Sequence, residues 1–72
     1  METRLKAFMT QHGITILRLA TMAELNENTV RSTRAGTSDP RRPTMVQMAR
    51  GASAILRRRV SVNELFDLGD DE

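Results

Sequence analysis

The chain has 72 residues, a formal net charge of +2 and no cysteine, so it has room for one domain and cannot form a disulfide framework or a thiolate metal site. No apolar run approaches the roughly 20 residues of a membrane span, and the opening stretch METRLKAFM lacks the apolar core of a signal peptide. We therefore expect a cytoplasmic protein that does not enter a membrane.

Charges are distributed unevenly along the sequence. Residues 31–59 hold eight arginines against a single acidic residue, Asp39, whereas residues 60–72 hold five acidic residues and no basic one. This pattern indicates a surface for a polyanion followed by a segment that avoids one. Arginine also suits bidentate contact with phosphate or guanine. The only aromatic residues, Phe8 and Phe66, argue against the stacking surfaces that bind single-stranded nucleic acid.

A first helix is predicted over residues 2–12, because Leu5, Phe8 and Met9 fall on one helical stripe. Gly13 then stands where a helix C-cap is expected. His12 is the only histidine and has no cysteine or second histidine near it, so we expect no metal site.

Two short helices joined by a tight turn are predicted over residues 15–36. The first runs over 16–22, the turn is 23–25, and the second runs over about 27–34. Thr15 can cap the first helix and Asn26 the second. Ala20 is small where two helix backbones must cross, Leu25 fills the corner, and Val30 holds the second helix against the core. The outer face is left polar, with short side chains, the form that fits a DNA major groove.

The residues of this region fall at the spacing of a known motif: Leu19-Ala20, Leu25-Asn26, Thr29-Val30 and Gly36. The chain thereby resembles the lambda-repressor-like, Cro-type helix-turn-helix domains over about residues 5–68. The resemblance implies an all-α, compact five-helix DNA-binding domain that usually acts as a dimer on a near-palindromic operator.

The chain departs from the family's pattern at three places. The usual turn glycine is Glu24, where a left-handed backbone would cost about 1–2 kcal/mol. The usual glutamine at the start of the first motif helix is Ile16. The usual leucine and glutamate after Val30 are Thr33 and Arg34, so the family's ion pair back to the first motif helix is absent.

A proline-containing loop over residues 37–43 is followed by two further predicted helices. A Thr44–Gln47 capping box would start a helix from residue 45 to about 58. The apolar stripe keeps its phase across Gly51, so the helix is expected to be continuous despite a cost near 1 kcal/mol relative to alanine.

The last predicted helix covers residues 62–68 and stops at Gly69. A Ser61–Glu64 capping box starts it, and Val60 and Leu65 are placed for a hydrophobic staple. We expect residues 1–69 to form the domain and residues 70–72 to be a disordered acidic tail.

The predicted contacts with DNA form two sets. Candidates for base contact are Glu27, Asn28, Thr29, Arg31 and Ser32. Asn28 could pair with adenine, Glu27 could accept from a cytosine amino group, and Thr29 could touch a thymine methyl. In the resembled fold, phosphates would be held by Thr15, Arg18, Thr37, Ser38, Arg41, Arg42 and Thr44. The alternative for the helix over 27–34 is an ordinary solvated face.

Several other residues have two interpretations. Arg57, Arg58 and Arg59 cannot share one helix face, so a solvated helix end is favoured over contact with DNA or a partner. Ile16 and Leu17 are either packed against the fourth helix or part of a dimer seam. Met22 is either core filler or a partner-binding edge.

Nothing in the sequence assembles a catalytic set, so we expect no enzyme, no cofactor and no small-molecule ligand. The leading hypothesis is a small Cro-type repressor of a phage or mobile element that binds double-stranded DNA as a homodimer. The alternative is a protein-interaction module, an antitoxin or adaptor that keeps the fold. A sequence-blind architectural DNA protein is the third hypothesis, which the acidic tail opposes.

Overall fold

The computed structural model describes residues 3–66, which form five α-helices and no strand. The helices are α1 (Arg4–His12), α2 (Ile16–Ala23), α3 (Glu27–Ala35), α4 (Arg42–Leu56) and α5 (Val62–Leu65). The prediction of an all-α chain is therefore confirmed for these residues. The predicted stop at Gly69 and the predicted tail over 70–72 lie outside the described residues. No helix within residues 3–66 has the length and apolarity needed to cross a bilayer.

Three helices begin at a side-chain cap. The side-chain oxygens of Thr3, Thr15 and Asn26 accept hydrogen bonds from the backbone N–H groups of Lys6, Arg18 and Asn28, at 2.7–3.1 Å. These bonds satisfy donors that the first turn of a helix leaves without partners. The first helix starts at Arg4 and not at residue 2 as predicted, because the backbone of Thr3 is extended.

Helices α1, α2, α3 and α4 all end at a residue in the left-handed conformation. Gly13 and Gly36 do so with φ of 66° and 82°. Glu24 and Arg57 adopt the same conformation with φ of 59° and 56°, although a Cβ atom makes it unfavourable. The left-handed turn at Glu24 was anticipated from the sequence, and the one at Arg57 was not.

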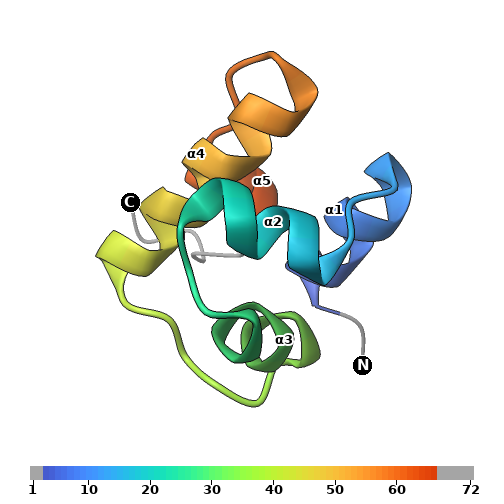
Figure 1. Ribbon diagram of the computed structural model, residues 1–72. Coiled ribbons are helices and arrows are strands. Elements are labelled where there is room, and N and C mark those ends of the chain that lie inside the picture. Colours follow the sequence, from blue (N-terminus) through green and yellow to red (C-terminus); the bar gives the residue numbers. More distant parts are fainter. Residues whose placement is uncertain (1–2, 67–72) are drawn as a thin grey trace.

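The helices pack around one core (Figure 1). Helix α2 packs on α3 and α4, while α1 packs on α3 and α5, and α5 also contacts α4. Each of the five helices contributes at least one of the largest fully buried side chains, which are Leu5, Met9, Leu19, Val30, Met48 and Leu65.

Helices α2 and α4 approach each other closely at Gly51. A Cβ atom built on Gly51 would lie 2.8 Å from the backbone nitrogen of Ala23 and 2.9 Å from its Cβ. Helix α4 is continuous through this glycine, as predicted, and the structure supplies a reason for the residue. The sequence predicts a close crossing at Ala20, which is buried, and the contact of Gly51 with Ala23 lies one turn further along α2.

The predicted start of the fourth helix at a Thr44–Gln47 capping box is wrong. Helix α4 begins at Arg42, with Arg41 as an N-cap that makes no side-chain bond and with a proline in the first turn. Pro43 is well suited there because its fixed φ is helical and its missing N–H needs no partner. The Gln47 side chain instead donates to the carbonyl of Ala23, at 3.4 Å. The helix ends at Leu56, before the predicted residue 58, because Arg57 turns left-handed.

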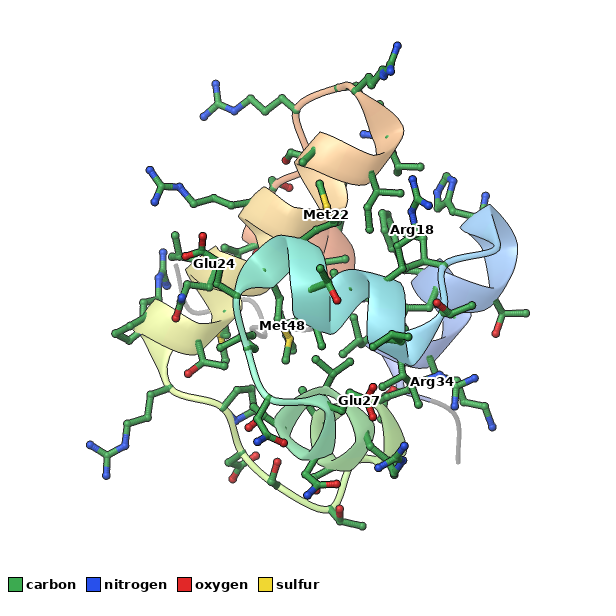
Figure 2. All side chains as sticks on the ribbon, viewed as in Figure 1. Arg18, Met22, Glu24, Glu27, Arg34 and Met48 are labelled. Carbon is green, nitrogen blue, oxygen red and sulfur yellow. The ribbon has the colours of Figure 1, made fainter. Side chains whose placement is uncertain are left out.

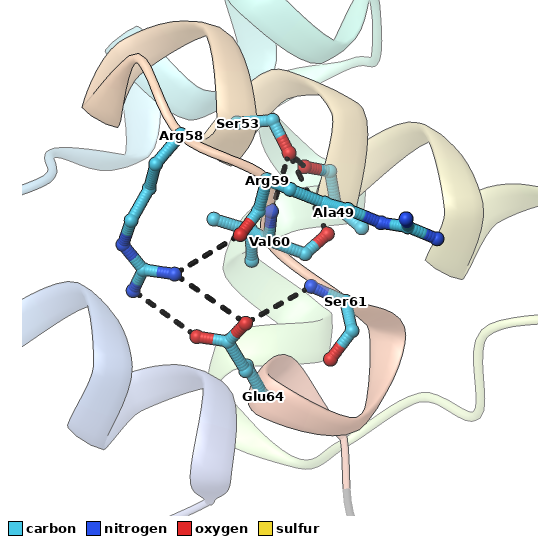
Figure 3. A network of polar contacts seen from close by, with 7 residues as sticks. All are labelled: Ala49, Ser53, Arg58, Arg59, Val60, Ser61 and Glu64. Carbon is cyan, nitrogen blue, oxygen red and sulfur yellow. Dashed lines mark hydrogen bonds and ion pairs between the residues drawn. The ribbon is translucent and has the colours of Figure 1, made fainter.

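A polar network links the end of α4 to the start of α5 (Figure 3). The Ser53 hydroxyl donates to the Ala49 carbonyl at 2.7 Å and accepts from the Val60 N–H at 2.9 Å. Glu64 accepts from the Ser61 N–H at 3.1 Å, which confirms the predicted capping box. Its carboxylate also pairs with the Arg58 guanidinium at 3.1 Å.

Helix α5 is shorter than predicted. It ends at Leu65, because Phe66 has an extended backbone with φ −134° and ψ 136°. The two residues predicted to form a staple, Val60 and Leu65, are both buried in the core.

Candidate nucleic-acid interface

Helix α3 is fixed to the rest of the molecule along one side only. Val30 is completely buried, and Thr33, on the same side one turn later, is buried as well. The buried Thr33 hydroxyl has a hydrogen-bond partner, because it donates to the Thr29 carbonyl at 2.7 Å. The prediction that Val30 holds this helix against the core is confirmed.

The turn between α2 and α3 sets the direction of α3. The backbone N–H of Leu25 donates to the Ala20 carbonyl at 2.8 Å, which closes the end of α2 through the left-handed Glu24. Leu25 itself packs against the core. The side-chain oxygen of Asn26 then accepts from the Asn28 N–H at 2.7 Å and starts α3. The chain therefore changes direction within three residues, and α3 lies at one end of the molecule (Figure 1).

The candidate base-contacting residues lie on α3, and none of them is buried. Glu27, Asn28 and Arg31 are exposed, whereas Thr29 and Ser32 are half-buried. Arg31 donates to the side-chain oxygen of Asn28 at 3.0 Å and lies 3.9 Å from the Glu27 carboxylate. The Arg31 side chain thus contacts both Asn28 and Glu27, an arrangement that the sequence did not reveal.

The candidate phosphate-contacting residues fall into two groups on either side of α3. Thr15 and Arg18 belong to the first turn of α2, where the Thr15 hydroxyl accepts from the Arg18 N–H and the Arg18 side chain is exposed. The second group follows α3 along the loop to the start of α4. Its members are Thr37, Ser38, Arg41, Arg42 and Thr44.

In the second group, two hydroxyls make contacts within the protein, whereas two guanidinium groups are exposed. The Thr37 hydroxyl donates to the Ser32 carbonyl at 3.2 Å, and the Ser38 hydroxyl lies 3.5 Å from that of Thr33. These two bonds tie the loop to the C-terminal half of α3. Arg41 and Arg42 are exposed, and Thr44 is half-buried in the first turn of α4.

Of the apolar residues with two interpretations, Ile16 packs against the core, while Leu17 is 60% exposed and Met22 43% exposed. Figure 2 shows Met22 on the side of α2 that lies toward α4. Ile16 therefore packs against the core, whereas Leu17 and Met22 lie on the surface, and the prediction of Met22 as core filler is wrong.

The three consecutive arginines at the end of α4 also separate. Arg57 forms the left-handed cap, Arg58 pairs with Glu64, and Arg59 lines a groove beside α4. Arg42 and Arg50 line the same groove. Arg50 received no role from the sequence, although the helical spacing 42, 46, 50 was a usable signal for a shared face.

Within residues 3–66, no group of three or more His, Asp or Glu side chains is placed to hold a metal ion. Comparisons of the chain with protein-family models, curated proteins and solved structures gave no match.

Proposed function

We propose that this chain is a sequence-specific, double-stranded DNA-binding regulator of transcription, in which α2 and α3 form a lambda-repressor-like helix-turn-helix. The observation that carries the proposal is the anchoring of α3 by Val30 and Thr33 on one side, with a polar opposite face at one end of the molecule. A helix held in this way can enter the major groove, which is wide enough to admit it.

In the proposed complex, α3 reads bases through its N-terminal two turns. Asn28 pairs with an adenine edge and Glu27 accepts from a cytosine amino group, while Thr29 approaches a thymine methyl. Arg31 must leave Asn28 for a base or phosphate, so binding exchanges an intramolecular hydrogen bond of 3.0 Å for a contact with DNA. In the unbound protein, the bond between Arg31 and Asn28 keeps this face ordered.

Phosphates would be held on both sides of α3. The first turn of α2 offers Arg18 and the N-terminal N–H groups behind Thr15. The loop and the start of α4 offer Arg41, Arg42 and Thr44, with Thr37 and Ser38 fixing the loop to α3. Such contacts position the protein without reading sequence.

The departures from the family's pattern are compatible with this proposal. Glu24 has the left-handed backbone that the family's glycine normally provides. Ile16 packs against the core. Thr33 occupies a buried position with its hydroxyl bonded within α3.

By the resemblance, the regulator is of the Cro type, a repressor of a phage or mobile element that blocks polymerase access in the cytoplasm. It would act as a homodimer on half-sites about 10–10.5 bp apart. The first test is selection of bound sites from a random duplex library at about 0.15 M salt. An enriched inverted repeat with that spacing is expected, and a failure to enrich any sequence would refute the proposal.

A pair of substitutions tests the division of labour. Asn28→Ala should lose discrimination at one base position by about 1–3 kcal/mol, whereas Arg41→Ala should weaken all duplexes alike and reduce the salt slope by about 1. Affinities for the selected site and its single-base variants, measured at several salt concentrations, give both quantities. Identical behaviour of the two variants would show that α3 does not read bases.

A protein-interaction module is the second candidate, favoured by the exposure of Leu17 and Met22 on α2. An apolar interface there would show little dependence on salt, whereas neutralisation of several phosphates makes affinity fall steeply. A salt titration of the affinity for whichever partner is recovered separates the two functions.

A further inference from the structure

A groove of about 900 Å³ runs along the side of α4 that faces the segment leading into α5. Ala49 and Val60 are buried at its base, and the partly exposed Val46 and Val62 extend the apolar surface. Three exposed arginines lie along it: Arg42, Arg50 and Arg59. The groove therefore combines an apolar base with positively charged edges.

The arginines of the groove have no acidic partner among the described residues. The ion pairs within residues 3–66 are Glu27–Arg31 and Glu64–Arg58, and neither includes a groove arginine. Three guanidinium groups beside an apolar surface favour an occupant that is acidic and carries at least one aliphatic side chain.

We propose that the occupant is the chain's own segment 67–72, with the sequence DLGDDE. Its four carboxylates match the charge of the groove, and Leu68 supplies an aliphatic group for the apolar base. The position of its attachment is also suitable, because α5 has four residues and so spans only about 6 Å from the groove-lining Val62.

The lengths agree as well. The groove follows α4 from Arg42 to Ser53, a rise of roughly 16 Å at 1.5 Å per residue. Six extended residues reach about 20 Å. About 6 Å of this reach is used along α5 between Phe66 and Val62, so the segment can follow most of the groove without displacing α5.

This docking has a regulatory consequence that rests on the proposed function. Arg42 belongs both to the groove and to the proposed phosphate contacts, so the acidic segment and DNA compete for it. The docking itself does not depend on DNA binding, and its test contains no DNA.

The test uses the full chain, which has no natural cysteine, with a nitroxide attached at Gly69→Cys. This position leaves all four acidic residues of the segment intact. Broadening of backbone amide signals is measured at low salt, at Val46 and Arg50 in the groove and at Thr10 and Gln11 in α1, which does not pack on α4. We expect several-fold stronger broadening in the groove, lost at about 1 M salt, where the Debye length is about 3 Å.

Matched charge reversals identify the contact. Arg50→Glu should reduce the groove broadening to the level seen in α1, whereas Lys6→Glu, an equal charge change at an exposed position of α1, should leave it unchanged. Equal broadening in both regions, or no response to Arg50→Glu, would overturn the proposal. The last control is a mixture of chains that carry only the spin label and chains that carry only the isotope label. Broadening in this mixture would show that the groove binds the segment of a second copy, and it would overturn docking within one chain.

Discussion

The contact between α2 and α4 and the outer face of α3 are specified in opposite ways. At the first, Gly51 lies against the backbone of Ala23 so closely that even one added carbon has no room. At the second, the exposed Arg31 side chain contacts the exposed side chains of Asn28 and Glu27. The fold therefore constrains the α2–α4 contact tightly and leaves the α3 face to be determined by what it binds.

Among substitutions that test this comparison, Gly51→Ala is expected to change the free energy of unfolding most. Propensity alone would stabilise α4 by about 1 kcal/mol, but the new Cβ would lie 2.8 Å from a backbone atom. Overpacking typically costs about 1–3 kcal/mol and occasionally more, and here the clash is with backbone, so that α2 and α4 must move apart. We therefore expect a cost above that range and a net loss of about 3 kcal/mol in the free energy of unfolding, measured with urea. The control is Ala54→Gly at an exposed position of the same helix, which should cost about 1 kcal/mol. A Gly51→Ala chain more stable than the parent would mean that the helices are not in such close contact.

The two sides of α3 should respond differently to truncation. Val30→Ala removes fully buried methyl groups and should lower the free energy of unfolding by about 2 kcal/mol. Asn28→Ala, on the exposed face, should change it by less than about 0.5 kcal/mol. Comparable losses in the two urea titrations would remove the distinction between a structural and a binding side of α3.

The left-handed turns should respond to glycine. Glu24→Gly and Arg57→Gly should each raise the free energy of unfolding by up to about 1 kcal/mol, because they relieve the Cβ strain at positive φ. Gly13→Ala is the reverse control, since φ there is 66° and a Cβ would meet no atom within 4 Å. It should destabilise through backbone strain alone. A loss of stability on Glu24→Gly would show that its side chain contributes more than the strain removes.

The smallest expected effect concerns the pH dependence of the α4–α5 junction. The hydrogen bond from Arg58, followed by that from the Ser61 N–H, holds the pKa of Glu64 below its usual value of 4.5. A carboxyl whose pKa is lowered by folding stabilises the native state above its unfolded pKa, and this contribution is lost as pH falls through the folded pKa.

Glu64→Gln should therefore reduce the loss of stability between neutral pH and about pH 3, as read from urea midpoints. Arg58→Met should reduce it similarly, and the double substitution should add little to either single one. If the Glu64→Gln chain lost as much stability at acid pH as the parent chain, the ion pair between Arg58 and Glu64 would not persist in solution.

The elements that the sequence predicted well are those specified by neighbouring residues. Thr15, Asn26 and Ser61 each start a helix through bonds to residues two or three positions away, and Val30 follows from helical spacing. The Thr44–Gln47 pair has the composition of a capping box, yet Pro43 allows α4 to start earlier and Gln47 bonds to a residue on α2. The reason for Gly51 was also hidden, because the atom that excludes a side chain belongs to another helix.

For the candidate site, charge distribution predicted which part of the chain carries the basic surface, but not how its residues are partnered. The contact of Arg31 with Asn28 depends on rotamers. The grouping of Arg42 and Arg50 with Arg59 depends on how the chain turns at Arg57. Neither can be read from composition.

Helix α1 packs on α3 and α5 and, within residues 3–66, on neither α2 nor α4. Its first residues bond to distant parts of the chain, with the Thr3 hydroxyl donating to the Arg34 carbonyl at 2.7 Å and Arg4 donating to the Asn63 carbonyl at 2.9 Å. A local opening that releases α1 would remove its contacts with α5 and α3, while α5 keeps its contacts with α4, α3 keeps its contacts with α2, and α2 and α4 stay joined. Hydrogen exchange should therefore be slowest for the amides of α2 and α4 and faster for those of α1.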